Sequence, residues 1–153
     1  MALLQTNEAR GITTTPGPLT SGAVVEMDAE FTIPAGLVAG DVVEMLRLPA
    51  YCTVVDAMLV ADDLDTNATP TMALDVGFVS GVVGKKDNAR TCDNVFFSGD
   101  TIGRTGGVSR MTRAGGFRVA KVEEERAIGI RIATAAATLA VGTKVKLVVL
   151  IKQ

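Results

Sequence analysis

Apolar residues recur at every second position in several stretches of this chain, and this spacing constrains its fold more than any other feature. The block Ile33–Gly81 contains three such runs, separated by turn-forming residues. A spacing of two places the apolar side chains on one face of an extended strand. The block therefore predicts strands at 41–48, 52–61 and 71–79, and it indicates a sheet surface built for packing.

The same spacing predicts strands elsewhere in the chain. Ala23–Ile33 alternates apolar residues with acids, and Ala127–Ala133 and Lys144–Ile151 each place Ile, Val or Leu on one face. Phe117–Val122 is predicted as a further strand. No helical spacing alternates with these runs, which argues against a parallel α/β sheet. About eight short strands with irregular connections predict an all-β antiparallel sandwich of the jelly-roll type.

Two segments are predicted to be mainly loops. Residues 80–116 contain eight glycines, which imply long, open connections. A short helix is expected within Asn88–Ile102, because loops of this length normally contain some structure. Ala133–Ala140 is expected to be a loop or a strand edge, with a short helix as the alternative.

Residues 1–20 are predicted to be an extended arm that precedes a sandwich domain of residues 21–153. Thr13–Pro18 contains two prolines and a glycine, which exclude a helix and disrupt a central strand. Such an arm is either disordered or ordered by lying on a neighbouring molecule. The first residues lack a basic start and a long apolar run, so we expect no signal peptide. No stretch approaches the roughly 20 apolar residues of a membrane span, and we expect a soluble protein made in a cytoplasm.

The composition fits one aliphatic core. The chain has 153 residues, of which 48% are hydrophobic and only 4% aromatic, with no Trp. This length is sufficient for one domain whose core is stable without disulfides or a structural metal ion. Cys52 falls within a strand pattern and is expected to be a small buried hydrophobe. A Cys52–Cys92 disulfide is the less favoured alternative in a reducing compartment.

Charge is unevenly distributed along the chain. Residues 1–84 hold 11 acids and two bases, net −9, and residues 85–153 hold 13 bases and six acids, net +7. Between Thr101 and Val122 there are five bases and no acid. One interpretation is a docking surface for an acidic partner or another copy. The favoured interpretation is that a β-fold interleaves the halves and mixes these charges. Nucleic-acid binding is disfavoured, since the chain is mildly acidic and lacks interleaved aromatic residues.

The chain lacks the residues of common catalytic sites. It contains no histidine, which excludes the usual serine and cysteine triads, histidine zinc sites and the metal centre of enzymatic cupins. No nucleotide-binding glycine motif follows a strand, and Gly103–Gly107 shares only its glycine content with a phosphate loop. Asp56 and Asp75 lack the aromatic platforms of a glycosidase. We therefore expect neither enzymatic activity nor a cofactor.

One turn gathers oxygen ligands. Asp62, Asp63, Asp65 and Asn67 follow the strand predicted at 52–61. Hard oxygens at near-alternate positions suit Ca²⁺, but the glycine and distal glutamate of an EF-hand loop are missing. Because such side chains also stabilise turns without a metal, a plain turn is the favoured interpretation and metal ligation the alternative.

Seven short segments between residues 41 and 107 combine turn and strand signatures. They are Asp41–Val43, Leu48–Ala50, Ala61–Thr66, Leu74–Gly77, Asn94–Phe97, Thr101–Gly103 and Gly106–Gly107. In these segments the chain resembles the head decoration, or cement, proteins of tailed bacteriophages, over roughly residues 33–110. Several proteins of that group are jelly rolls with an N-terminal arm. The resemblance transfers no catalytic residue.

The resemblance implies a structural virion protein on the outer capsid surface, synthesised in the host cytoplasm. Its implied partners are the phage major capsid protein and further copies of itself, as a dimer or trimer. It would stabilise the capsid by clamping adjacent capsid subunits through the arm and one sandwich edge. The candidate interface residues are Leu3, Leu4, Thr13 and Pro16 of the arm and Arg104, Arg110 and Arg113 of the basic segment.

The alternative function is that of a carbohydrate- or receptor-binding jelly-roll module of a phage tail or head fibre. Such a module predicts a ligand groove with aromatic platforms or a Ca²⁺ site. The single tyrosine, Tyr51, and the missing tryptophan argue against it. An enzyme of the cupin type is a third class, which the absence of histidine disfavours.

Overall fold

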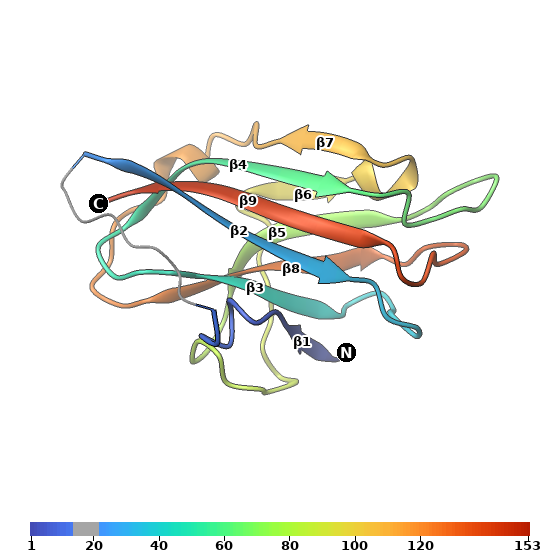
Figure 1. Ribbon diagram of the computed structural model, residues 1–153, viewed down its shortest axis with the longest axis horizontal. Coiled ribbons are helices and arrows are strands. Elements are labelled where there is room, and N and C mark those ends of the chain that lie inside the picture. The colour runs from blue at the N-terminus through green and yellow to red at the C-terminus, as the bar shows by residue number, and fades with distance from the viewer. Residues whose placement is uncertain (14–21) are drawn as a thin grey trace.

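The computed structural model describes residues 1–13 and 22–153, which form two β-sheets (Figure 1). The strand order is β1-β3-β8-β5-β6 in one sheet and β2-β9-β4-β7 in the other. The strands are β1 (Leu3–Gln5), β2 (Val24–Thr32), β3 (Val42–Leu48), β4 (Thr53–Ala61), β5 (Ala73–Val79), β6 (Phe97–Asp100), β7 (Gly107–Arg110), β8 (Arg126–Thr134) and β9 (Lys144–Lys152). Two short 3-10 helices, η1 (Ile102–Arg104) and η2 (Gly116–Arg118), lie in the connections.

Successive strands mostly cross from one sheet to the other. From β2 onward, β2, β4, β7 and β9 lie in one sheet and β3, β5, β6 and β8 in the other. All pairs among these strands are antiparallel. The arrangement confirms the predicted antiparallel sandwich, and its strand order is that of a jelly roll.

The main core lies between the two sheets and is aliphatic. In β9 the residues Val145, Leu147, Val149 and Ile151 are buried in this core, while Lys144 remains exposed. The two-residue spacing of the sequence therefore becomes one inward and one outward face. Burying such apolar surface stabilises a fold by roughly 25 cal/mol per Å².

Two predicted elements are wrong. Phe117–Val122, predicted as a strand, contains the end of η2 and an irregular segment. It runs beside the start of β4, where Thr53 Oγ1 donates to the Val119 carbonyl at 2.6 Å and the Tyr51 N–H donates to the Val122 carbonyl at 2.7 Å. These two hydrogen bonds take the place of the regular strand pairing predicted for this segment. The helix expected within Asn88–Ile102 is instead a single bridge at Cys92 followed by β6.

Residues 1–13 lie against their own chain, in contrast to the expected arm that is disordered or placed on a neighbour. β1 pairs in parallel with β3, with Leu3 opposite Val42, and so covers the edge of β3. Further along, Ala9 is fully buried and its carbonyl accepts a hydrogen bond of 2.6 Å from Arg47 Nε. The predicted boundary at residue 20 lies outside the described residues.

A second, smaller core covers the outer face of the five-stranded sheet. It consists of Leu3, Val42, Val79, Cys92 and Ala127. The chain between β5 and β6 crosses the sheet here, and Cys92 forms a bridge with Val79. The second core thus joins β1 and this connection to the sandwich.

The two cysteines are free and lie in different cores. Cys52 belongs to the main core and Cys92 to the second core. Burial, assisted by the neighbouring Asp93 charge, raises the pKa of the Cys92 thiol to about 12. The thiol therefore stays protonated at neutral pH, and Cys92 acts as a small packing residue, which is the role expected for Cys52.

The close crossing over the sheet requires glycine at one position. Gly77 lies opposite Gly129 in the β5–β8 pair. A Cβ atom at Gly77 would lie 2.5 Å from the Asp93 backbone oxygen, far inside van der Waals contact. The Asp93 side chain instead occupies this space and accepts a hydrogen bond of 2.9 Å from the Phe78 N–H.

We expect Gly77→Ala to lower the free energy of unfolding by about 3 kcal/mol, because the added methyl group displaces the crossing segment. Urea unfolding of the purified protein measures this change. Gly115→Ala is the matched control, since its Cβ would meet only Val95 at an ordinary 3.6 Å. Equal stability of the two variants would show that the crossing is not tight.

Candidate functional site

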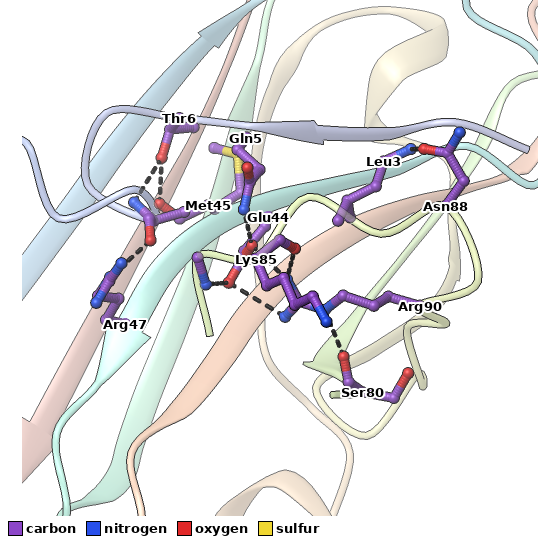
Figure 2. Close-up of polar contacts among 12 residues, drawn as sticks. Leu3, Gln5, Thr6, Glu44, Met45, Arg47, Ser80, Lys85, Asn88 and Arg90 are labelled. Carbon is purple, nitrogen blue, oxygen red and sulfur yellow. Dashed lines mark hydrogen bonds and ion pairs between the residues drawn. The ribbon is translucent and has the colours of Figure 1, made fainter. Parts of the chain in front are cut away.

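A buried carboxylate joins three separate segments of the chain. Glu44 lies in β3 and is 0% exposed. Its carboxylate accepts hydrogen bonds from Gln5 Nε2, from the Gly84 N–H at 2.9 Å and from both terminal nitrogens of Arg90 at 2.8 and 3.2 Å (Figure 2). We call the assembly of residues 1–12, β3 and residues 80–90 the N-terminal clasp.

The partner cation is equally well satisfied. Arg90 is 3% exposed, and besides Glu44 it donates to the Ser80 carbonyl at 2.5 Å and to the Lys85 carbonyl at 2.8 Å. A buried ion pair is tolerated only when its remaining hydrogen-bonding groups are also satisfied. The pair therefore fixes the conformation of the 80–90 loop as well as its contact with β3.

The first residues of the chain are fixed at both ends of the clasp. The Leu3 N–H donates to Asn88 Oδ1 at 3.4 Å, and Thr6 Oγ1 donates to the Met45 carbonyl (Figure 2). Thr6 Oγ1 also accepts a hydrogen bond of 3.2 Å from the Ala9 N–H. These contacts position backbone segments, and their chemistry is that of a structural joint.

A groove of about 510 Å³ lies beside the clasp. Arg10 and Lys86, both exposed, contribute positive charge to its rim, and neither forms an ion pair with a described residue. Opposite charges across an interface favour association and orientation. The groove therefore suits an acidic segment of a partner. Its lining consists of Leu3, Leu4, Gln5, Arg10, Gly84 and Lys86.

The four candidate interface residues of the arm are in different environments. Leu3 is buried in the second core, and Leu4 is half-buried against the main core. Both side chains are thus used largely inside their own chain, although they also line the groove. Thr13 is exposed. Pro16 lies outside the described residues.

The three candidate arginines are not brought together either. Arg104 Nε donates to the Met72 carbonyl at 2.8 Å, and Arg110 forms an ion pair with the buried carboxylate of Asp56. Arg113 is exposed in the connection between β7 and β8. Of the three, only Arg113 forms neither a hydrogen bond nor an ion pair through its guanidinium group within the described chain.

The fold mixes the charges of the two halves of the chain. Each of the six ion pairs among the described residues joins a residue of 1–84 to one of 85–153, which confirms the favoured interpretation of the charge asymmetry. Asp56 and Asp75, considered above as glycosidase carboxylates, are both paired with arginine. The six pairs are Arg47–Glu125, Arg90–Glu44, Arg110–Asp56, Arg131–Asp75, Lys144–Glu30 and Lys146–Asp28.

The oxygen-rich turn uses its side chains on the protein backbone. Asp62 accepts from the Lys144 N–H at 2.8 Å, and Asp63 accepts from the Asp65 N–H at 3.1 Å. Asn67 accepts from the Thr69 N–H at 3.0 Å. Within the described chain, no group of three or more His, Cys, Asp or Glu residues is arranged to hold a metal ion.

Asp65 is the structural centre of this turn. It is 1% exposed, and its carboxylate accepts from the N–H groups of four residues: Thr71 at 2.7 Å, Met72 at 3.1 Å, Ala137 at 3.0 Å and Thr138 at 2.8 Å. Burial by itself raises the pKa of Asp65, but these four donors outweigh it and hold the pKa well below its usual range. Asp65 therefore joins the β4–β5 connection to the β8–β9 connection.

No helix among the described residues is long and apolar enough to cross a membrane.

We expect Glu44→Ala to lower the free energy of unfolding by about 3–5 kcal/mol, because Arg90 is left buried without its counter-charge. Urea unfolding at neutral pH measures the loss. The control is Glu30→Ala, which breaks an exposed ion pair with Lys144 and is expected to cost about 1 kcal/mol or less. Similar costs for the two variants would contradict the role given to the clasp.

We expect the stabilisation by Asp65 to depend on pH in the acid range. Its pKa is lowered on folding, so its contribution is complete above the unfolded value of about 3.9 and is lost as the pH falls below it. Asp65→Asn should therefore be less stable than the natural chain at neutral pH, and the difference should shrink in acid. Urea unfolding at pH 7, 4 and 2.5 measures it, with Asp63→Asn as the control. A difference that stays constant with pH would contradict this account.

Sequence comparisons give no family assignment. No family model matches the chain, and no curated protein matches it.

Solved structures do match. A chain of the Cyanophage Pam1 capsid asymmetric unit has a TM-score of 0.71 at 27% identity, covering 92% of this chain and 91% of that one. A chain of the acidic stable capsid of Helicobacter pylori bacteriophage KHP30 shares the fold, with a TM-score of 0.56 at 17% identity over 88% of this chain and 90% of that one. A chain of the capsid of Ralstonia phage GP4 has a TM-score of 0.96 at 42% identity, covering 99% of this chain and 98% of that one. The protein therefore belongs to the family of phage capsid proteins that includes this chain of the Ralstonia phage GP4 capsid.

Proposed function

We propose that this chain is a structural virion protein that binds the exterior of a phage capsid and stabilises it by clamping adjacent major capsid proteins. The observation that carries the proposal is the match to a chain of the Ralstonia phage GP4 capsid over 99% of this chain at 42% identity. A match of this extent includes the sandwich and its connections, so the chain as a whole serves the capsid.

The internal chemistry of the fold supports a structural role. The buried carboxylates Glu44, Asp56, Asp65 and Asp75 all accept hydrogen bonds from arginine side chains or backbone N–H groups. These contacts hold connections and strand pairs in place, which is what a structural protein requires of its buried polar groups. A rigid sandwich is suited to transmitting mechanical load between capsid subunits.

The structure changes the way in which the arm would act. Residues 1–12 form part of the N-terminal clasp, so they contribute a fixed surface next to the groove. In the proposed clamp, an acidic segment of one capsid subunit lies in this groove between Arg10 and Lys86. The edge of β1 beside it offers a short row of backbone groups for pairing with an extended segment.

Self-association into a dimer or trimer is part of the proposal. β2 is the long outer strand of its sheet, and it carries Glu26, Asp28 and Glu30. Charged side chains on an outer strand discourage edge-to-edge pairing. Contacts between copies on the capsid would therefore use surfaces other than the β2 edge.

The alternative, a carbohydrate- or receptor-binding module, gains little support. It predicts a ligand groove with aromatic platforms. The groove beside the clasp is lined by aliphatic, polar and basic residues and by no aromatic residue.

We expect the purified protein to bind saturably to capsids assembled from the major capsid protein of the same phage, and to raise the temperature at which they rupture. Cosedimentation and a thermal release assay measure the two effects. Neutralising the groove with Arg10→Gln and Lys86→Gln should weaken binding about tenfold, because interface cations orient and hold an acidic partner. The control is the double variant Lys144→Gln and Lys146→Gln, which removes the same number of positive charges outside the groove. Absence of binding by the natural chain, with binding to glycans instead, would favour the alternative function.

A further inference from the structure

The turn between β3 and β4 places a tyrosine where the backbone favours glycine. The Cys52 N–H donates to the Pro49 carbonyl at 3.3 Å, which closes a four-residue turn with Tyr51 as its third residue. Tyr51 has a φ of 60°, and it is the only non-glycine residue of the described chain with a positive φ. Turns with positive φ at the third residue prefer glycine or asparagine there, because a larger side chain strains the backbone.

The fold makes little use of the Tyr51 side chain. It is 51% exposed, and within the described chain its hydroxyl forms no hydrogen bond and its ring no aromatic pair. The one hydrogen bond that ties Tyr51 to the neighbouring connection is made by its backbone N–H to Val122, and glycine would make the same bond. A strained residue that persists at an exposed position points to a function outside the fold.

A second exposed aromatic residue lies at the same end of the sandwich. Phe117 in η2 is also 51% exposed. The hydrogen bond from Thr53 to the Val119 carbonyl holds this connection against the start of β4, next to the turn that carries Tyr51. Figure 1 shows the β3–β4 turn and the β7–β8 connection together at the end that carries the C-terminus.

This end of the sandwich carries charged residues of both signs, and only some of them form ion pairs within the described chain. Arg113, Arg118 and Lys121 are exposed, and none forms an ion pair with a described residue. Of the acids that follow in the same connection, Glu125 is paired with Arg47, and Glu123 and Glu124 are exposed. A partner that contacts the aromatic residues therefore meets three unpaired cations, Arg113 before η2, Arg118 in η2 and Lys121 after it, and two exposed acids further along, Glu123 and Glu124.

We propose that Tyr51 and Phe117, flanked by Arg113, Arg118 and Lys121, form a second docking surface for the major capsid protein, at an apolar site of that protein bordered by carboxylates. The inference rests on the proposed function: a clamp between adjacent subunits needs two separate contact surfaces, and the groove beside the clasp supplies only one. Aromatic residues and arginine are the types enriched among residues that contribute most to protein interfaces.

The decisive variant is Tyr51→Gly, because it separates folding from binding. Glycine relieves the strained turn, so the thermal unfolding midpoint of the isolated variant should equal or exceed that of the natural chain. Its affinity for capsids assembled from the major capsid protein should fall about tenfold or more, since a central aromatic contact is lost. Val141→Ala, at an exposed valine in the β8–β9 connection, is the control and should change neither quantity.

A second variant tests the charge of the partner. Arg118→Glu combined with Lys121→Glu should weaken capsid binding and reduce its dependence on salt concentration, because the lost contacts are electrostatic.

Each outcome separates the inference from the proposed function. If the natural chain binds capsids and Tyr51→Gly binds equally well, the second docking surface is wrong and the proposed function stands. A lower unfolding midpoint for Tyr51→Gly would assign Tyr51 a structural role and overturn the inference. Unchanged binding by the charge-reversed variant would exclude an acidic partner surface. If the natural chain does not bind capsids at all, the proposed function itself fails.

Discussion

The layer outside the five-stranded sheet depends on the buried ion pair between Glu44 and Arg90. Removing two charges from water is costly, and the cost is offset only when every lone pair and proton finds a partner. Here Glu44 comes from β3, and the further partners of the pair come from β1 and from the loop at residues 80–90. These segments must therefore adopt their positions together, and the first residues of the chain become part of the fold.

This coupling explains the additional layer of chain outside the five-stranded sheet, which makes three layers together with the two sheets. The connection between β5 and β6 crosses the sheet directly above Gly77, where a missing side chain lets the backbone approach. The second core then fills the space between this crossing and β1 with Leu3, Val42 and Cys92. The opposite sheet has no such cover among the described residues, and it carries its charges in cross-strand ion pairs.

Six ion pairs among the described residues use part of the surface charge within the fold, and the remaining exposed charged groups are available to a partner. Among the described residues, the groove at Arg10 and Lys86 and the aromatic end at Tyr51 and Phe117 are two places where unpaired cations accompany exposed apolar groups or a free strand edge. In the proposed function each of them would contact the major capsid protein. The match to the Ralstonia phage GP4 capsid chain is the reason to seek a partner for both surfaces within a capsid.

The two-residue spacing in β2 to β5, β8 and β9 was enough to predict the all-β sandwich, because strands with an apolar face bury it by packing sheet against sheet. The sequence also indicated that the fold mixes the charges of the two halves of the chain, because a sandwich brings strands from both halves together. It did not reveal the strand in the first residues, the irregular path of Phe117–Val122 or the strained Tyr51. These features became visible in the folded chain alone, because each involves a partner far away in the sequence: Glu44 for Gln5, Thr53 for Val119 and Val122 for Tyr51.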